Sequence, residues 1–201
     1  MADHLLAYPL TPKTVHLCVD MQRIFSEDGP WPTPWMGRVL PVIKQIVHRH
    51  PERAVFSRFI TPLDPGEMPG MWRCYYTRWR PATRACIHPG LLELMPELQR
   101  YSPPARVIDK TRYSAFFGSH LWQHLQDREA DGLIITGSET DVCVLATVLS
   151  AVDLGYRVIL VRDALCSSSD EGHDALMKMY QSRYTEQIEM TDAETVLSDW
   201  R

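Results

Sequence analysis

The alternation of short apolar runs with longer segments of helical periodicity constrains the fold of this 201-residue chain more than any other feature. The runs are rich in β-branched residues and have the length of strands, whereas residues 38–50 carry apolar side chains at the spacing of one helix face. Strands are expected at 14–20, 54–60, 107–109, 133–136, 157–161 and 188–190, and helices at 38–50, 121–125, 142–154 and 170–184.

This order of elements predicts an α/β fold. Strands that alternate with helices imply right-handed crossovers and a mostly parallel sheet with helices on both faces. Ligands of such sheets bind beyond the carboxyl ends of the strands. Asp20, Lys110 and the loop 137–142 each follow an expected strand. We therefore expect these three segments to converge on one edge of the sheet.

Length and composition predict one domain. A chain of 201 residues can bury one sizeable core and is short for two. Two regions interrupt the alternation of elements: residues 25–35 are rich in Pro and Trp, and residues 61–90 hold many aromatic and Met side chains. We expect a single domain over residues 1–201 with an aromatic-rich insertion at about 61–90.

Charge and cysteine usage exclude several classes of function. The net charge is −4 and no run of Lys or Arg occurs, so a nucleic-acid partner is not expected. No apolar stretch reaches the roughly 20 residues of a membrane span. The N-terminal segment lacks the pattern of a secretion signal.

The five cysteines form no CxxC pair, so the sequence indicates neither a disulfide framework nor a zinc knuckle. A reducing cytoplasm is therefore the expected location.

Cys143 is the candidate nucleophile. It follows the letters TGSETDV and opens an expected helix, where unpaired backbone N–H groups and the helix dipole favour the reactive thiolate. An arbitrary cysteine is more often a buried structural residue. We keep that structural interpretation for the other cysteines, Cys18, Cys74, Cys86 and Cys166.

Asp20 and Lys110 are candidates for the same site. Taken alone, a carboxylate at a strand end can equally cap a turn, and a lysine is most often at the surface. Taken together with Cys143, both side chains follow expected strands at the ligand-binding edge. A carboxylate near a thiol can accept its proton, and a lysine can hold that carboxylate in place.

Three motifs give the chain a resemblance to the isochorismatase-like hydrolase superfamily, in its cysteine-hydrolase branch. They are VDMQ around Asp20, DKTRYSAFFGS around Lys110 and LIITGSETDVCVLATVLSAVDLGYRVILVRDA around Cys143. The resemblance spans the chain from Val15 to Asp174 and implies a Rossmann-like three-layer α/β/α sandwich with a six-stranded sheet. It also implies Asp20, Lys110 and Cys143 as catalytic triad, a cis peptide bond at Ser138–Glu139, and an oxyanion hole formed by the backbone amides of Glu139 and Cys143.

The resemblance also limits the reaction. Related nicotinamidases carry an Asp-x-His metal motif after the second strand, whereas this chain has Ser57-Arg58-Phe59 there, so neither a metal nor another cofactor is expected. Isochorismatases proper lack the nucleophilic cysteine. The expected reaction is hydrolysis of a C–N bond in a small amide, N-carbamoyl compound or ureide through a thioester. The alternatives are an isochorismatase-type hydrolase of another small molecule and a catalytically silent binding subunit.

Aromatic and arginine side chains near these motifs are candidates for binding the substrate. Aromatic residues are equally common in cores and interfaces, and arginines are usually at the surface. The expected substrate-binding residues are Phe25, Trp72, Tyr75, Trp79, Tyr113 and Arg58, with Trp31, Trp35, Arg73 and Arg80 as further candidates. The resemblance implies a homodimer or homotetramer, for which the insertion is a suitable contact surface.

Overall fold

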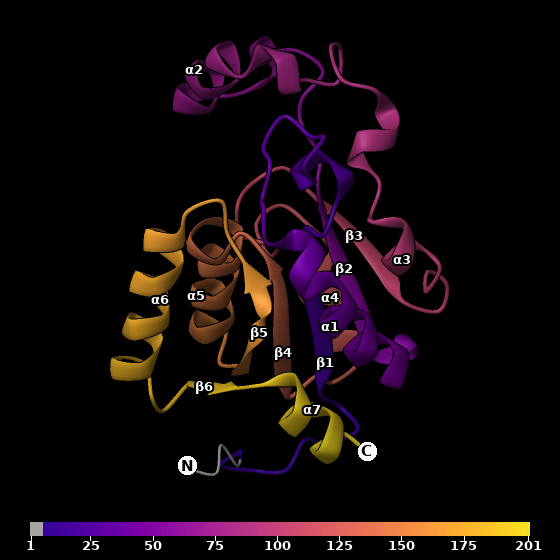
Figure 1. Ribbon diagram of the computed structural model, residues 1–201, viewed down its shortest axis with the longest axis vertical. Helices are drawn as coiled ribbons and strands as arrows, with labels where there is room; N and C mark the ends of the chain where they lie inside the picture. Colours follow the sequence, from indigo (N-terminus) through magenta and orange to yellow (C-terminus); the bar gives the residue numbers. More distant parts are fainter. Residues whose placement is uncertain (1–5) are drawn as a thin grey trace.

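The computed structural model describes residues 6–201, and at its centre is a six-stranded sheet whose strand pairs are all parallel (Figure 1). Residues 1–5, part of the segment in which no secretion signal is expected, lie outside the described residues. The strand order is β3-β2-β1-β4-β5-β6. The strands are β1 (Val15–Val19), β2 (Ala54–Phe59), β3 (Arg106–Lys110), β4 (Gly132–Ser138), β5 (Arg157–Cys166) and β6 (Ile188–Thr191).

Helices cover both faces of the sheet, which confirms the expected α/β/α sandwich. Helices α1 and α7 contribute their apolar side chains to one core, and helices α4, α5 and α6 contribute theirs to the other. Figure 1 shows the sheet between these two groups. The helices are α1 (Met36–Arg49), α2 (Gly70–Arg78), α3 (Pro96–Gln99), α4 (Leu121–Asp127), α5 (Leu145–Asp153), α6 (Asp170–Ser182) and α7 (Ala193–Asp199).

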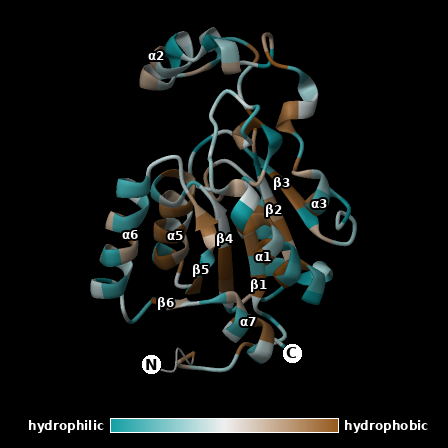
Figure 2. Cartoon of the chain, in the orientation of Figure 1, coloured by the Kyte–Doolittle hydropathy of each residue, from teal (hydrophilic) through white to brown (hydrophobic). Residues whose placement is uncertain are grey.

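The strands are buried on both faces, and their side chains alternate between the two cores. In β1, Cys18 packs into the core beneath α1, whereas its neighbours Leu17 and Val19 pack into the core beneath α5. The strands therefore have hydrophobic residues at successive positions, while polar side chains gather on the outer helix faces (Figure 2). Across residues 6–201, no helix combines the length and apolar character needed to cross a membrane.

Several elements differ in extent from the sequence-based expectation. Strand β5 continues to Cys166, five residues beyond the expected end at 161. The expected helix at 142–154 begins instead as a π-helical turn at Thr140–Val144 and becomes α-helical at Leu145. Helix α7 and the short helix α3 were not expected. The polar and proline-containing sequences of these short elements carry little periodicity.

The insertion at 61–90 contains helix α2 and short 3-10 helices, and it lies beyond the carboxyl ends of the strands (Figure 1). Tyr76 is its anchor to the core, because this side chain is fully buried, whereas Met71 on the same helix is exposed. The insertion also contacts residues 25–35, since the rings of Trp31 and Trp79 lie 5.8 Å apart. The two irregular regions of the sequence thus pack together above the sheet edge.

Gly137 allows β4 to lie directly against β1 at the end where the site forms. Its φ angle is +109°, which L side chains rarely adopt, and a Cβ atom added there would collide with the backbone of Val19. The position therefore requires glycine for both conformation and space.

We expect Gly137→Ala to lower the free energy of unfolding by at least about 2 kcal/mol, because strain and a backbone collision add at one residue. Gly37→Ala is the matched control, since Gly37 lies in helix α1 with open space around its Cα. This control should change stability by no more than about 1 kcal/mol, in the stabilising direction. Denaturant unfolding of both variants measures the difference, and equal stabilities would contradict the assigned role of Gly137.

Candidate active site

Asp20 and Lys110 form a buried ion pair at the carboxyl edge of the sheet. Lys110 Nζ lies 2.6 Å from Asp20 Oδ2, and neither side chain is exposed to solvent. Asp20 follows β1 directly and has a left-handed backbone conformation, with a φ angle of +48°. Lys110 ends β3, so its side chain reaches past the end of the intervening β2. The structure thus brings together two of the three residues that the motifs single out.

Neutral groups complete the surroundings of this ion pair. The hydroxyl of Ser57, on β2, donates a hydrogen bond of 2.6 Å to the other carboxylate oxygen of Asp20. Lys110 Nζ donates to the backbone carbonyl of Arg112 at 3.0 Å and lies 4.9 Å from the ring centroid of Phe59. Asp20 and Lys110 therefore each have a hydrogen-bond partner besides the opposite charge. A buried charged group needs such partners because water cannot reach it.

The charged state of Lys110 follows from its neighbours. Burial lowers the pKa of its ammonium group, but the charge of Asp20 and contact with Cys143 raise it by more, so the net pKa lies above the ordinary value. Lys110 is therefore positive at neutral pH. An ammonium that keeps its proton can fix a carboxylate in place while that carboxylate exchanges protons with another group.

Cys143 lies in the π-helical turn between β4 and α5, and its side chain is buried. The helix N-terminus was expected to favour the thiolate. Instead, burial raises the pKa of the thiol, the charge of Lys110 lowers it, and Asp20 raises it, with a net pKa well above the ordinary value. The resting group is a neutral thiol, because desolvation outweighs the local positive charge. The charges of Asp20 and Lys110 thus act on the pKa of this thiol in opposite directions.

The other cysteines divide into two groups. Cys18 and Cys166 are buried, as a structural role requires. Cys74 and Cys86 are exposed, so the expectation of a buried structural role is wrong for these two. Both lie in the insertion, Cys74 on helix α2 and Cys86 in a turn after the 3-10 helix at Arg80–Ala82.

A small pocket opens onto Cys143. It encloses about 220 Å³ between the carboxyl edge of the sheet and the insertion. Five of the residues expected to take part in binding or catalysis line it in addition to Cys143, namely Phe25, Trp31, Tyr75, Tyr113 and Glu139. The remaining lining residues are Phe59, Val142 and Ser168.

Other expected binding residues lie outside this lining. The Trp72 ring packs 4.8 Å from that of Tyr113, and Trp79 packs against Trp31, so both support the wall from behind. The guanidinium of Arg58 is held by Asp109 at 2.8 Å and by Glu93 at 2.7 Å. The arginine therefore serves as an ion-pair partner rather than lining the pocket, because its strand directs it away from the cavity.

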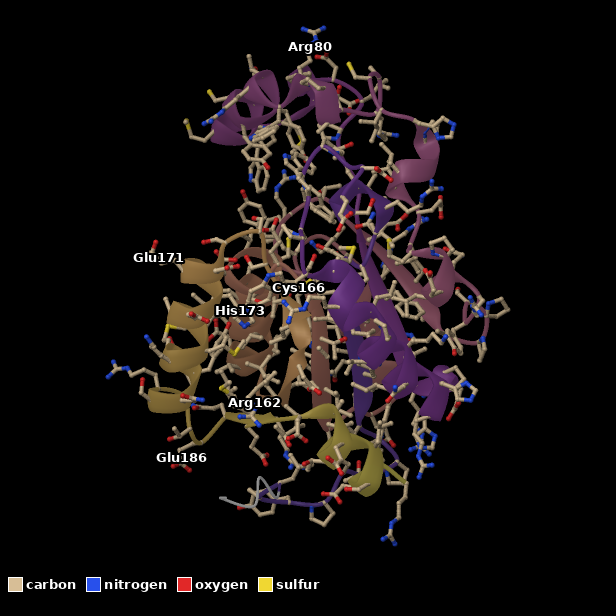
Figure 3. The ribbon with its side chains drawn as sticks, in the orientation of Figure 1. Arg80, Arg162, Cys166, Glu171, His173 and Glu186 are labelled. Atoms are coloured by element: carbon tan, nitrogen blue, oxygen red, sulfur yellow. The ribbon has the colours of Figure 1, made fainter. Side chains whose placement is uncertain are left out.

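The remaining candidates are also placed by their contacts. Arg73 donates a hydrogen bond to the backbone of its own segment, at Met68. Arg80 is exposed at the far end of the insertion (Figure 3). The Trp35 ring lies 5.2 Å from that of His173 on helix α6, outside the pocket.

Three residues of the candidate site were not expected from the sequence. Phe59 ends β2, so the rule that ligands bind at the carboxyl ends of strands would have found it. Ser57 was noted only as a replacement for a metal ligand, although its hydroxyl holds Asp20. Ser168 follows β5, and it was missed because that strand was expected to end at 161.

The turn before Cys143 has the backbone form that the resemblance implies, since the Ser138–Glu139 peptide bond is cis. Within the described part of the chain, no cluster of three or more His, Cys, Asp or Glu side chains is arranged to hold a metal ion.

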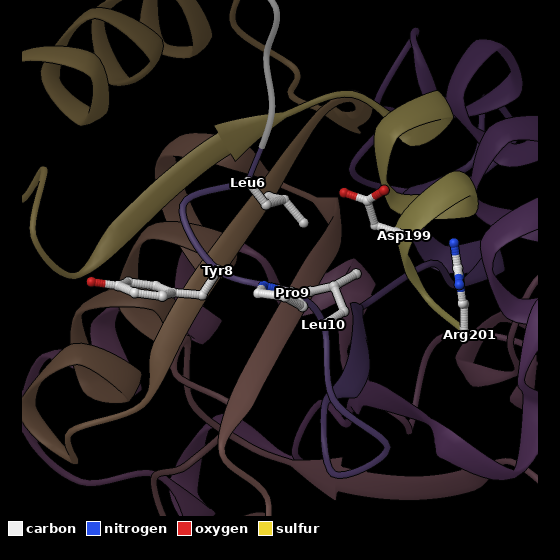
Figure 4. A pocket seen from close by; sticks show the side chains of 6 residues that line it. All are labelled: Leu6, Tyr8, Pro9, Leu10, Asp199 and Arg201. Carbon is white, nitrogen blue, oxygen red and sulfur yellow. The ribbon is translucent and has the colours of Figure 1, made fainter.

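A larger cavity of about 410 Å³ lies at the end of the molecule that holds Leu6 and Arg201 (Figure 4). It contains none of the site residues expected from the sequence, as its described lining is Leu6, Tyr8, Pro9, Leu10, Asp199 and Arg201.

The chain belongs to the isochorismatase family, because the isochorismatase domain model matches residues 14–192. Phenazine biosynthesis protein PhzD1 from Pseudomonas aeruginosa is 32% identical over 185 residues, 90% of this chain and 84% of that protein. Two further matches cover shorter stretches at similar identity. An uncharacterized isochorismatase family protein from Bacillus subtilis is 37% identical over 83 residues, 40% of this chain and 45% of that protein. Nicotinamidase from Escherichia coli is 31% identical over 112 residues, 52% of each chain.

Solved structures share the fold over almost the whole chain. A cysteine hydrolase from Pseudomonas syringae pv. phaseolicola superposes with a TM-score of 0.84 at 23% identity, covering 99% of this chain and 98% of that one. N-carbamoylsarcosine amidase from Thermoplasma acidophilum superposes with a TM-score of 0.73 at 20% identity, covering 90% of this chain and 96% of that one. The resemblance seen in the motifs is therefore confirmed at the level of family and fold.

Because the ion pair is buried, removing one charge should destabilise the protein more than removing both. We expect Lys110→Met to lower the free energy of unfolding by about 3–5 kcal/mol, because it leaves the carboxylate of Asp20 buried without its counter-ion. The double variant Asp20→Asn/Lys110→Met should recover part of this loss, since it buries no charge. Denaturant unfolding of the three proteins measures both effects; a double variant less stable than Lys110→Met would contradict this account.

Proposed function

We propose that the protein is a cysteine-dependent hydrolase that cleaves a C–N bond of a small amide, N-carbamoyl compound or ureide. The observation that carries the proposal is the placement of a neutral thiol, that of Cys143, beside the buried Asp20–Lys110 ion pair and in the wall of a small pocket. A nucleophile, an acid–base group and a fixed positive charge are the parts that covalent hydrolysis of an amide requires.

In the first half of the proposed reaction, the Asp20 carboxylate accepts the proton of the thiol as the sulfur of Cys143 attacks the substrate carbonyl carbon. The raised pKa of the thiol makes this base necessary, because a neutral thiol is a weak nucleophile. The tetrahedral intermediate then expels ammonia or an amine, which takes the proton from Asp20. The products of this half are a thioester on Cys143 and the free amine.

In the second half, Asp20 accepts a proton from water as the water oxygen attacks the thioester carbonyl. The intermediate collapses, releases the acid and returns the proton to the sulfur of Cys143. Lys110 keeps its proton throughout and holds Asp20 between the two steps. We assign the backbone amides of Glu139 and Cys143 to the oxyanion hole; both residues line the pocket. Such donors stabilise the charge that develops on the carbonyl oxygen.

The names of two compared proteins support an amide as substrate, because nicotinamidase and N-carbamoylsarcosine amidase both describe hydrolysis of amide-type bonds. The alternative is an isochorismatase-type hydrolase without thiol chemistry, or a silent binding subunit. The position of Cys143 in the lining of the pocket favours the thiol reaction over both. A homodimer or homotetramer, a cytoplasmic location and the absence of a cofactor stay predictions.

An ammonia-release screen over primary amides, N-carbamoyl compounds and ureides tests the proposal. On any substrate found, we expect Cys143→Ala to lower kcat/KM by at least about 1,000-fold, because the covalent route is lost. Cys86→Ala is the control, since Cys86 is exposed and outside the pocket. Near-normal turnover by Cys143→Ala, with both variants folded, would exclude the thiol mechanism and favour the alternative without thiol chemistry.

A further inference from the structure

The pocket beside Cys143 combines an aromatic wall with one unpaired carboxylate, that of Glu139. We propose that this combination selects small amides that carry a positive charge, such as a quaternary or protonated amine, at the end remote from the amide. The inference rests on the proposed function, because it specifies the substrate class of the same site. It departs from the expectation that arginine side chains take part in binding the substrate.

The wall of the pocket is built largely of aromatic rings that pack against one another. The rings of Phe25 and Trp31 stack with centroids 6.0 Å apart. Trp31 lies 6.2 Å from both Phe59 and Tyr75. Tyr113 completes the lining on the side of Cys143. Aromatic faces carry negative electrostatic potential, and several of them together are the usual recognition site for an alkylated ammonium group.

Glu139 supplies the formal charge of the pocket. Its Oε2 atom accepts hydrogen bonds from the backbone N–H of Ser168, at 3.2 Å, and from the hydroxyl of the same residue. These bonds fix the carboxylate at the pocket wall without neutralising it, because serine is uncharged. Among the described residues, no lysine, arginine or histidine forms an ion pair with Glu139.

Neighbouring positive charges are already neutralised or turned outward. The ammonium of Lys110 is offset by Asp20 at 2.6 Å. Arg58 is held by two carboxylates. The guanidinium of Arg112 lies over the ring of Trp72, 5.2 Å from its centroid, and Trp72 is not part of the lining. A substrate carboxylate would therefore be repelled by Glu139 and would find no free positive group. A substrate cation would instead be attracted by both Glu139 and the aromatic rings.

The size of the cavity limits the substrate as well. Its volume of about 220 Å³ lies below the roughly 300–1,000 Å³ of pockets that take drug-sized ligands. One amide group and one small cationic group fill such a space. The expected substrates are therefore short amino-amides or their N-methylated forms rather than peptides or large heterocycles.

Three short primary amides test the charge preference: 3-(trimethylammonio)propanamide, its neutral isostere 4,4-dimethylpentanamide, and the anionic succinamate. The first two have the same shape, because a quaternary nitrogen replaces a quaternary carbon. Ammonia release gives kcat/KM for each compound, and titration calorimetry gives each binding constant without requiring turnover. Both measurements use the wild-type protein, Glu139→Gln and the control Glu186→Gln.

We expect the wild-type protein to prefer the cationic amide over its neutral isostere by about fivefold or more, and succinamate to be the poorest of the three. Glu139→Gln should reduce the cationic-to-neutral ratio by about fivefold, whereas Glu186→Gln should not change that ratio. Glu186 is exposed at the end of the molecule away from the insertion (Figure 3). Comparing ratios cancels the intrinsic reactivity of each amide.

The two readouts separate this inference from the proposed function. Preferential binding of the cation that depends on Glu139, without ammonia release from any amide, upholds the charge preference and contradicts the amidase reaction. Ammonia release with an equal or greater preference for the neutral or anionic amide upholds the reaction and overturns the charge preference. A cationic-to-neutral ratio that is the same in the wild-type protein and in Glu139→Gln also overturns it. Glu139→Gln keeps the backbone amide, so it leaves the assigned oxyanion hole intact.

Discussion

The ion pair between Asp20 and Lys110 is the interaction on which the rest of the site depends. Removing two charges from water costs several kcal/mol for each ion, and close contact with full hydrogen bonding is needed to offset that cost. The structure provides both, with a 2.6 Å ion pair and a hydrogen bond from Ser57. These three residues come from the ends of β1, β3 and β2, so the charges are satisfied only while the three strands keep their register.

The sheet order explains why a thiol joins this pair. The chain leaves β1 toward β2 on one side and returns to β4 on the other, which places the loop after β4 at the point where the strand order reverses. Cys143 lies in that loop, beside Asp20. Gly137 makes the approach possible, because any other residue at this position would collide with Val19. Thus one backbone position without a side chain lets β4 pair closely with β1 just before the loops that carry Cys143 and Asp20.

The sequence predicts the regular parts of this fold well and the irregular parts poorly. Burial on both faces makes the strands continuous apolar runs, and the amphipathic face of α1 repeats at helical spacing, so both are visible in the letters. The insertion has no such period, because Tyr75 lines the pocket, Tyr76 is buried in the core and Met71 faces solvent within one short helix. Arg58 was wrongly expected to bind the substrate, because the sequence does not show that Asp109 and Glu93 form ion pairs with its guanidinium in the fold.

The contrast between regular and irregular segments also applies within the site, between the groups proposed for catalysis and the walls of the pocket. The groups proposed for catalysis come from strand ends, where the register of the sheet fixes them. Part of the aromatic wall of the pocket comes instead from the two irregular regions, with Trp31 on one and Tyr75 on the other. Because Asp20 and Lys110 cancel one another, they give the pocket almost no net charge. Among the described lining residues, Glu139 alone carries a carboxylate, so under the proposed charge preference a substitution there should change the choice of substrate without moving Cys143.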